Sequence, residues 1–222
     1  MGTCEMENIK EDDDELKIKY LPRILSLEEY KQIESLMSLK EKIWFGMQFY
    51  CGLRQREVVE LKRNEINLHT GVSYIVGSKL ARQRIIIIPS LFISLIKEYV
   101  DLYEPDNFLF ENGTGRKYKD VAHLRELLKK YCRKAGLYNA GDVTHYSLRH
   151  SFATHMIESG VPIEILSSLL GHIDVETTMR FYIHLGFKIK HYWVNAVFGK
   201  VTDNPVYSRS EVFKYKLPYS FV

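Results

Sequence analysis

One short β-rich stretch interrupts a sequence whose apolar residues otherwise repeat with helical spacing, and this interruption restricts the fold more than any other feature. Val72, Tyr74 and Val76 alternate along the chain, a polar turn covers residues 77–83, and a second β-rich run follows at 84–88. Two such runs joined by a polar turn are typical of a β-hairpin. The sequence therefore predicts a small antiparallel hairpin within a mainly helical protein.

Helical patterns occupy most of the remaining chain. Ser26 followed by Glu29 matches a capping box, and the apolar stripe after it predicts a first helix that ends near Lys40. A second apolar helix is expected over residues 43–50, and a third begins after Gln55. Four more helices are predicted beyond the hairpin, over residues 90–103, 119–135, 144–159 and 162–170. Together these elements predict an α+β fold that is mainly α-helical, with one small antiparallel sheet.

Charge and composition divide the chain into three parts. Residues 1–20 contain seven acids and three lysines, so this segment carries −4 and is expected to form a flexible arm or linker. The rest of the chain carries +7, because the whole chain has a formal charge of +3. The folded domain is predicted over residues 21–184, and residues 185–222 form an aromatic-rich tail. A basic domain favours a polyanionic partner such as nucleic acid.

The sequence also argues against several classes of protein. No apolar run approaches the roughly 20 residues that cross a membrane, and the N-terminus lacks an apolar signal segment. We therefore expect a cytoplasmic location, at the nucleoid or, for a viral or plasmid protein, in the host cytoplasm.

Cys4, Cys51 and Cys132 include no Cys-x-x-Cys pair, which predicts reduced thiols and no zinc site. Cys51 and Cys132 are expected to be buried in helices. No glycine-rich phosphate loop is present, so no nucleotide cofactor is expected.

Three segments carry the residues that could perform chemistry. They read YCGLRQREVVEL at 50–61, THYSLRHSFATHMIESG at 144–160 and LLGHIDVETTMRFYIH at 169–184. In order and spacing they resemble the motif boxes of the tyrosine recombinase, or phage integrase, family. Each string alone recurs by chance in helical proteins, whereas the three together are specific, and the resemblance covers about three-quarters of the chain. It implies the catalytic-domain fold of that family, in which a β-hairpin lies between the first two boxes.

The resemblance implies a set of catalytic residues for cleaving a DNA phosphodiester. Arg54 and Arg149 would bind the non-bridging phosphate oxygens, whose developing negative charge suits planar guanidinium groups. Tyr182 would be the nucleophile, and it needs nearby cations or an adjacent base because a free tyrosine has a pKa of about 10. Lys79, in the hairpin turn, would protonate the leaving 5′ oxygen, and His172 would bind the phosphate or assist proton transfer from the tyrosine. This chemistry requires no metal.

One departure from the family pattern concerns the residue that accompanies Arg149. The family places a histidine three residues before this arginine, where this chain has Tyr146, while His145 stands four residues before it. Both offsets face Arg149 on a helix. Tyr146 is the preferred phosphate ligand, since some archaeal plasmid and viral integrases resemble this chain in having a non-histidine residue there, and His145 is the alternative. Glu57 and His150 match family positions whose side chains orient the catalytic groups.

A second departure concerns the nucleophile. The family register would place Phe181 at the tyrosine position, with Tyr182 one residue later. A phenylalanine ring has no oxygen to attack a phosphate, so Tyr182 is expected to be the nucleophile. The shift keeps open a non-catalytic DNA-binding regulator built on the same scaffold.

We therefore predict a site-specific DNA recombinase or integrase that acts through a 3′-phosphotyrosyl intermediate, with an archaeal mobile element as its source. A type IB topoisomerase, which shares the chemistry but relaxes supercoils, is the enzymatic alternative. Double-stranded DNA is the expected partner, and no cofactor is expected. The resemblance also implies a tetramer on DNA, in which the tail after residue 184 docks on a neighbouring subunit or packs on its own domain.

Overall fold

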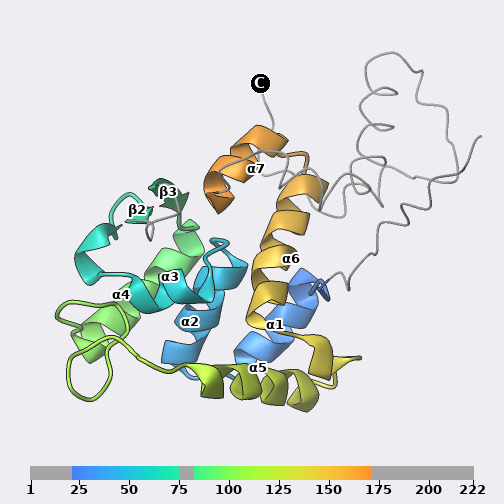
Figure 1. Cartoon of the computed structure of the whole chain (residues 1–222), viewed down its shortest axis with the longest axis horizontal. Helices are drawn as coiled ribbons and strands as arrows, with labels where there is room; N and C mark the ends of the chain where they lie inside the picture. The colour runs from blue at the N-terminus through green and yellow to red at the C-terminus, as the bar shows by residue number, and fades with distance from the viewer. Residues whose placement is uncertain (1–21, 76–82, 172–222) are drawn as a thin grey trace, which may run out of the picture.

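The computed structural model describes residues 22–75 and 83–171 of the 222-residue chain, and Figure 1 shows how their elements are arranged. The described residues form, in chain order, α1 (Leu27–Ser35), α2 (Leu39–Phe49), α3 (Gln55–Glu60), β1 (Ile66–Asn67), β2 (Val72–Ile75), β3 (Arg84–Ile87), α4 (Ser90–Tyr103), α5 (Ala122–Lys134), α6 (His145–Glu158) and α7 (Ile163–Leu170). Short 3₁₀ turns, η1 and η2, cover Arg63–Glu65 and Ala140–Asp142. The predicted mainly α-helical α+β fold is confirmed.

The first helix ends earlier than the sequence analysis predicted. Its N-terminus follows the expected capping box, in which the Glu29 amide donates to Ser26 Oγ at 3.1 Å. However, α1 ends at Ser35, and a second capping box starts α2 at Leu39. In that box the amide of Ser38 donates to a Glu41 carboxylate oxygen at 2.7 Å. The prediction of one helix to Lys40 was therefore wrong, because Ser38 caps a new helix instead of continuing the old one.

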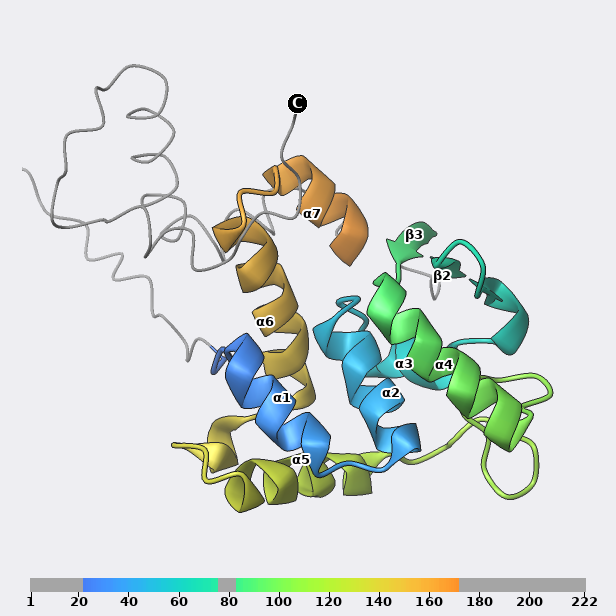
Figure 2. The same cartoon turned by 180° about the vertical axis from the view of Figure 1, so that it is seen from behind.

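Helix α2 forms the centre of the hydrophobic core. Figure 2 shows it with α1 and α6 on one side, α3 and α4 on the other, and α5 across one end of the bundle. Its residues Ile43, Phe45 and Met47 are fully buried, and Phe49 stacks on Tyr30 of α1 with ring centroids 3.8 Å apart. Residues 43–49 are all buried, so the C-terminal part of α2 lies in the interior and the surrounding helices pack against it.

The predicted hairpin is part of a three-stranded antiparallel sheet in the order β1-β2-β3. Tyr74 pairs with Ile85 on the exposed face, and Ile75 pairs with Arg84 on the buried face. Strand β1, which has only two residues, was not predicted, since so short a segment shows no alternation. The residues 76–82 that connect β2 to β3 lie outside the described part of the chain.

The helices beyond the sheet lie close to their predicted ranges. Helix α4 matches its range, and α6 begins after Thr144, whose hydroxyl accepts a hydrogen bond from the Ser147 amide. Helix α5 begins at Ala122, later than the predicted residue 119, because the Asp120 carboxylate accepts the Ala122 amide at 2.8 Å.

Two of the cysteines are buried as predicted, although Cys51 lies in the turn after α2 and not within a helix. Cys51 and Cys132 are free and buried, and burial raises the pKa of the Cys132 thiol to about 11. Among residues 22–75 and 83–171, no helix is long and apolar enough to cross a membrane. The same residues contain no group of three His, Cys, Asp or Glu side chains that could hold a metal ion.

Candidate active site

Arg54 lies at the junction of α2 and α3, where Gly52 turns the chain. Gly52 has a φ of +67°, in the region that favours glycine, and a Cβ at this position would lie 2.5 Å from the ring of Phe152 in α6. Helix α6 therefore packs directly against the backbone of the junction. This close packing places the first motif box beside Arg149 of the second.

Backbone carbonyl groups from two elements fix the Arg149 guanidinium. Its Nη1 donates to the Gly52 carbonyl oxygen at 2.6 Å, and its Nη2 donates to the Leu170 carbonyl oxygen at the end of α7 at 2.6 Å. Nη1 also lies 3.7 Å from Glu57 Oε2. Because the guanidinium is planar, these contacts set the orientation of the whole group.

Glu57 is the common partner of three arginines. Its oxygens accept the backbone amide of Arg54 at 2.7 Å and Arg54 Nη1 at 3.0 Å. The same two oxygens accept both Nη atoms of Arg84 at 2.6 and 2.7 Å. Burial alone would raise the pKa of Glu57, but the hydrogen bonds and charge of Arg84, the Arg54 amide and the charge of Arg149 lower it to about 2. Glu57 is therefore ionised at neutral pH and holds the arginines together.

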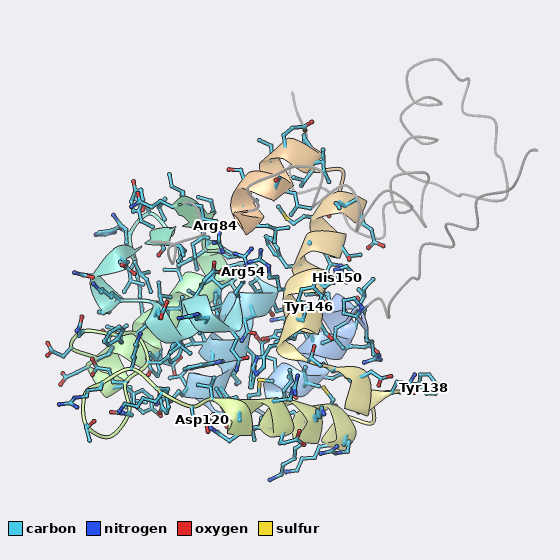
Figure 3. All side chains as sticks on the ribbon, in the orientation of Figure 1. Arg54, Arg84, Asp120, Tyr138, Tyr146 and His150 are labelled. Carbon is cyan, nitrogen blue, oxygen red and sulfur yellow. The ribbon has the colours of Figure 1, made fainter. Side chains whose placement is uncertain are left out.

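The three arginines around Glu57 differ in their access to solvent. The side chain of Arg54 is 40% exposed, that of Arg149 is 7% exposed and that of Arg84 is 3% exposed. Three positive groups around one carboxylate leave an excess of two positive charges, which attracts a phosphate. Figure 3 shows Arg54 and Arg84 close together, with Tyr146 and His150 on α6.

The two candidates for the remaining phosphate ligand face different environments. His145 is buried, and its Nδ1 lies 2.9 Å from Gln48 Oε1. Burial, with the charge of Arg125, lowers the pKa of His145 to about 4. Tyr146 is 51% exposed and stacks on His150, with ring centroids 6.1 Å apart. The exposed Tyr146 is better placed than His145 to contact a phosphate from solvent.

The other predicted catalytic residues, Lys79, His172 and Tyr182, lie outside the described residues, as does Phe181. The structure thus brings Arg54 and Arg149 together around Glu57, and it places Tyr146 one turn before Arg149 on the same helix.

Arg84 was not among the predicted site residues, although it contacts Glu57 more closely than Arg149 does. In the sequence, Arg84 stands out only as the first residue of a β-rich run. A signal was nevertheless present, because Arg84 alternates with Ile86 and Ile88 on the side of the strand that is buried. An arginine in such a position needs an acidic partner.

The sequence model of the phage integrase family matches residues 17–188. Tyrosine recombinase XerA of Thermococcus onnurineus is 34% identical over 169 residues, which cover 73% of this chain and 58% of that protein. Tyrosine recombinase XerD of Listeria monocytogenes is 28% identical over 179 residues, which cover 74% of this chain and 59% of that protein. The chain therefore spans less than two-thirds of the length of these relatives.

Solved structures show the same fold. A crystal structure of XerA recombinase gives a TM-score of 0.69 at 24% identity, and covers 82% of this chain and 67% of that chain. A pre-cleavage complex of XerH site-specific recombinase with its difH substrate gives a TM-score of 0.64 at 25% identity, and covers 77% of this chain and 53% of that chain.

Proposed function

Because the chain belongs to the phage integrase family, we propose that it is the catalytic part of a tyrosine recombinase or integrase, which cleaves and rejoins duplex DNA at specific sites. The observation that carries this proposal is the arrangement of Arg54 and Arg149 around the ionised Glu57. Displacement at a phosphodiester builds negative charge on the non-bridging oxygens, and pre-positioned guanidinium groups stabilise that charge. Tyr146, exposed on the same helix as Arg149, would add a hydroxyl donor.

In the proposed reaction, the Tyr182 oxygen attacks phosphorus and forms a 3′-phosphotyrosyl bond. The bond from phosphorus to the 5′ oxygen breaks, and that oxygen takes a proton from Lys79. The phenol proton passes to His172 or to water. A 5′ hydroxyl of the same or another strand then reverses these steps, so rejoining consumes no cofactor.

The proposed partners are double-stranded DNA and further copies of the chain, assembled as a tetramer on the DNA. An apolar groove lined by Leu27, Phe49, Phe152 and Met156 supports self-association, since an aromatic segment from the tail 185–222 could fill it. We propose a cytoplasmic location, at the nucleoid or in the host cytoplasm of a virus or plasmid.

A covalent-adduct assay tests the proposal. The chain is incubated with supercoiled plasmid and with nicked duplexes that trap the cleaved strand, and denaturing gels then detect protein attached to DNA. The adduct should form with the wild-type chain and with Tyr138→Phe, which alters an exposed tyrosine on the loop after α5, well separated from Arg54 in Figure 3. It should be absent in Tyr182→Phe. Binding of DNA without any adduct would refute the proposed reaction and favour a non-catalytic DNA-binding protein.

Product analysis in the same experiment separates the two enzymatic possibilities. Strands exchanged between two duplexes identify a recombinase, whereas relaxed plasmid without exchange identifies a topoisomerase.

A further inference from the structure

Arg84, at the start of β3, joins two segments that carry site residues. All three guanidinium nitrogens are engaged: the two Nη atoms bind the oxygens of Glu57 in α3, and Nε donates to the Leu169 carbonyl oxygen at 2.8 Å. Leu169 precedes Leu170, whose carbonyl oxygen accepts from Arg149. Arg84 and Arg149 therefore bind adjacent carbonyl groups at the C-terminal end of α7, where a helix leaves carbonyls unsatisfied and favours positive charge.

The end of α7 packs directly against the Arg84 side chain. Gly171, with a φ of +64°, ends the helix, and a Cβ there would lie 2.7 Å from Arg84 Cδ and 2.9 Å from its Nη1. No larger residue fits without moving the arginine. The contact holds the C-terminal end of α7 against the Arg84 side chain.

Arg84 is the most enclosed of the three arginines, with a side chain only 3% exposed, and each of its guanidinium nitrogens already binds a protein acceptor. Its effect must pass through its partners. A planar guanidinium matches both oxygens of a carboxylate, whereas a lysine ammonium is a point charge that cannot span them together with a third acceptor.

The charge of Glu57 explains what Arg84 contributes. Glu57 also attracts Arg54, at 3.0 Å, and Arg149, at 3.7 Å. While Arg84 binds both carboxylate oxygens, its positive charge weakens the electrostatic attraction of Glu57 for Arg54 and Arg149. Without Arg84, the buried carboxylate would be balanced by Arg54 and Arg149 instead, and it would draw these arginines inward, away from an incoming phosphate.

We propose that Arg84 is a positioning residue for DNA cleavage, which binds Glu57 and the end of α7 and thereby sets the orientation in which Arg54 and Arg149 meet the scissile phosphate. This inference rests on the function proposed above. Arg84 contacts neither DNA nor the reacting atoms.

The test uses Arg84→Lys, which keeps the positive charge but loses the planar guanidinium group that binds both carboxylate oxygens. Single-turnover cleavage is measured on a normal duplex and on one with a methylphosphonate at the scissile position, in which a methyl group replaces one non-bridging oxygen. On the normal duplex, the cleavage rate constant should fall by roughly 10- to 100-fold while the Kd for DNA changes less than about threefold. On the methylphosphonate, which is uncharged before attack, the loss should shrink to less than about threefold, because the transition state carries one negative charge fewer for the arginines to stabilise.

The matched control is Arg23→Lys, which alters another enclosed arginine–glutamate pair. Arg23 binds Glu29 at 2.5 Å, and its side chain is 17% exposed. This variant should lose stability but retain the wild-type rate constant on both duplexes. An Arg84→Lys variant that cleaves at the wild-type rate, that slows equally on both duplexes, or that behaves like Arg23→Lys would overturn the proposal.

Amide hydrogen exchange provides a readout that does not depend on cleavage. In Arg84→Lys, amides in α3 and at the end of α7 should exchange at least about tenfold faster, while those in α1 keep the wild-type rate. In Arg23→Lys, amides in α1 should exchange faster, while those in α3 and at the end of α7 keep the wild-type rate. Unchanged exchange in α3 and α7 would refute the positioning role even if the wild-type chain forms no adduct. Absence of the wild-type adduct, by contrast, refutes the proposed function.

Discussion

The Arg149 guanidinium and the Gly52 carbonyl oxygen lie 2.6 Å apart, although 97 positions separate the two residues in the sequence. This hydrogen bond joins the second motif box to the first. It depends on a glycine, because only a residue without a side chain allows α6 to approach the α2–α3 junction so closely.

Gly52→Ala should therefore destabilise the fold and disturb the site together. A non-glycine residue at positive φ costs about 1–3 kcal/mol, and the clash with Phe152 adds about 1–3 kcal/mol. Urea unfolding measures the loss. Gly160→Ala is the matched control, because its φ is +82° but nothing lies within 4 Å of the added Cβ. Equal losses in the two variants would contradict the proposed close packing.

Glu57→Gln should lower the unfolding free energy at neutral pH by about 3–5 kcal/mol, because it leaves the enclosed Arg84 without its counter-charge. The pKa of Glu57 falls from an ordinary 4.5 to about 2 in the folded chain. Its contribution is thus fully present above pH 4.5 and is lost as the pH falls toward 2. The unfolding midpoints of the wild type and the variant should therefore converge as the pH falls from 4.5 toward 2. A difference between the two midpoints that stays constant with pH would show that the pKa of Glu57 is not lowered.

His145 should remain neutral under mildly acidic conditions. Its pKa is lowered from 6.5 to about 4, so the unfolded chain takes up a proton at a higher pH than the folded chain does. The stability contribution of a neutral His145 is full above pH 6.5 and declines as the pH falls toward 4. Nuclear magnetic resonance of the imidazole checks this directly. A midpoint near 6.5 would show that His145 is not held in the buried position against Gln48.

Tyr146→Phe should reduce the cleavage rate while leaving the fold intact, because the exposed hydroxyl is the group that would meet the phosphate. A hydrogen bond to a charged group is worth about 1.5–3 kcal/mol, so the rate should fall by roughly 10- to 100-fold. His145→Asn should instead lower the unfolding midpoint and keep the rate within about threefold. The opposite result in single-turnover cleavage would assign the phosphate contact to His145.

Local patterns in the sequence were enough to predict much of the fold. The capping pair Ser26 and Glu29 is three residues apart, and the alternation that marked the hairpin lies within each strand. The break between α1 and α2 was missed because the apolar pattern runs across it, although Ser38 and Glu41 repeat the same capping pattern.

The network around Glu57 could be predicted only in part. The resemblance to a known family identified Arg54 and Arg149, but the contact between Glu57 and Arg84 spans 27 positions and depends on how β3 packs against α3. Nothing local in the sequence encodes such a pairing. The same limit applies to the choice between His145 and Tyr146, which depends on which side of α6 faces α2.

In the proposed reaction, Tyr182 forms the covalent bond to DNA. The most direct measurement is to trap the adduct on a nicked duplex, digest the protein and identify the nucleotide-bearing peptide by mass spectrometry. We expect a 3′-phosphodeoxynucleotide on Tyr182 and on no other residue. A nucleotide on any other side chain, or a trapped complex with no covalent link, would contradict it.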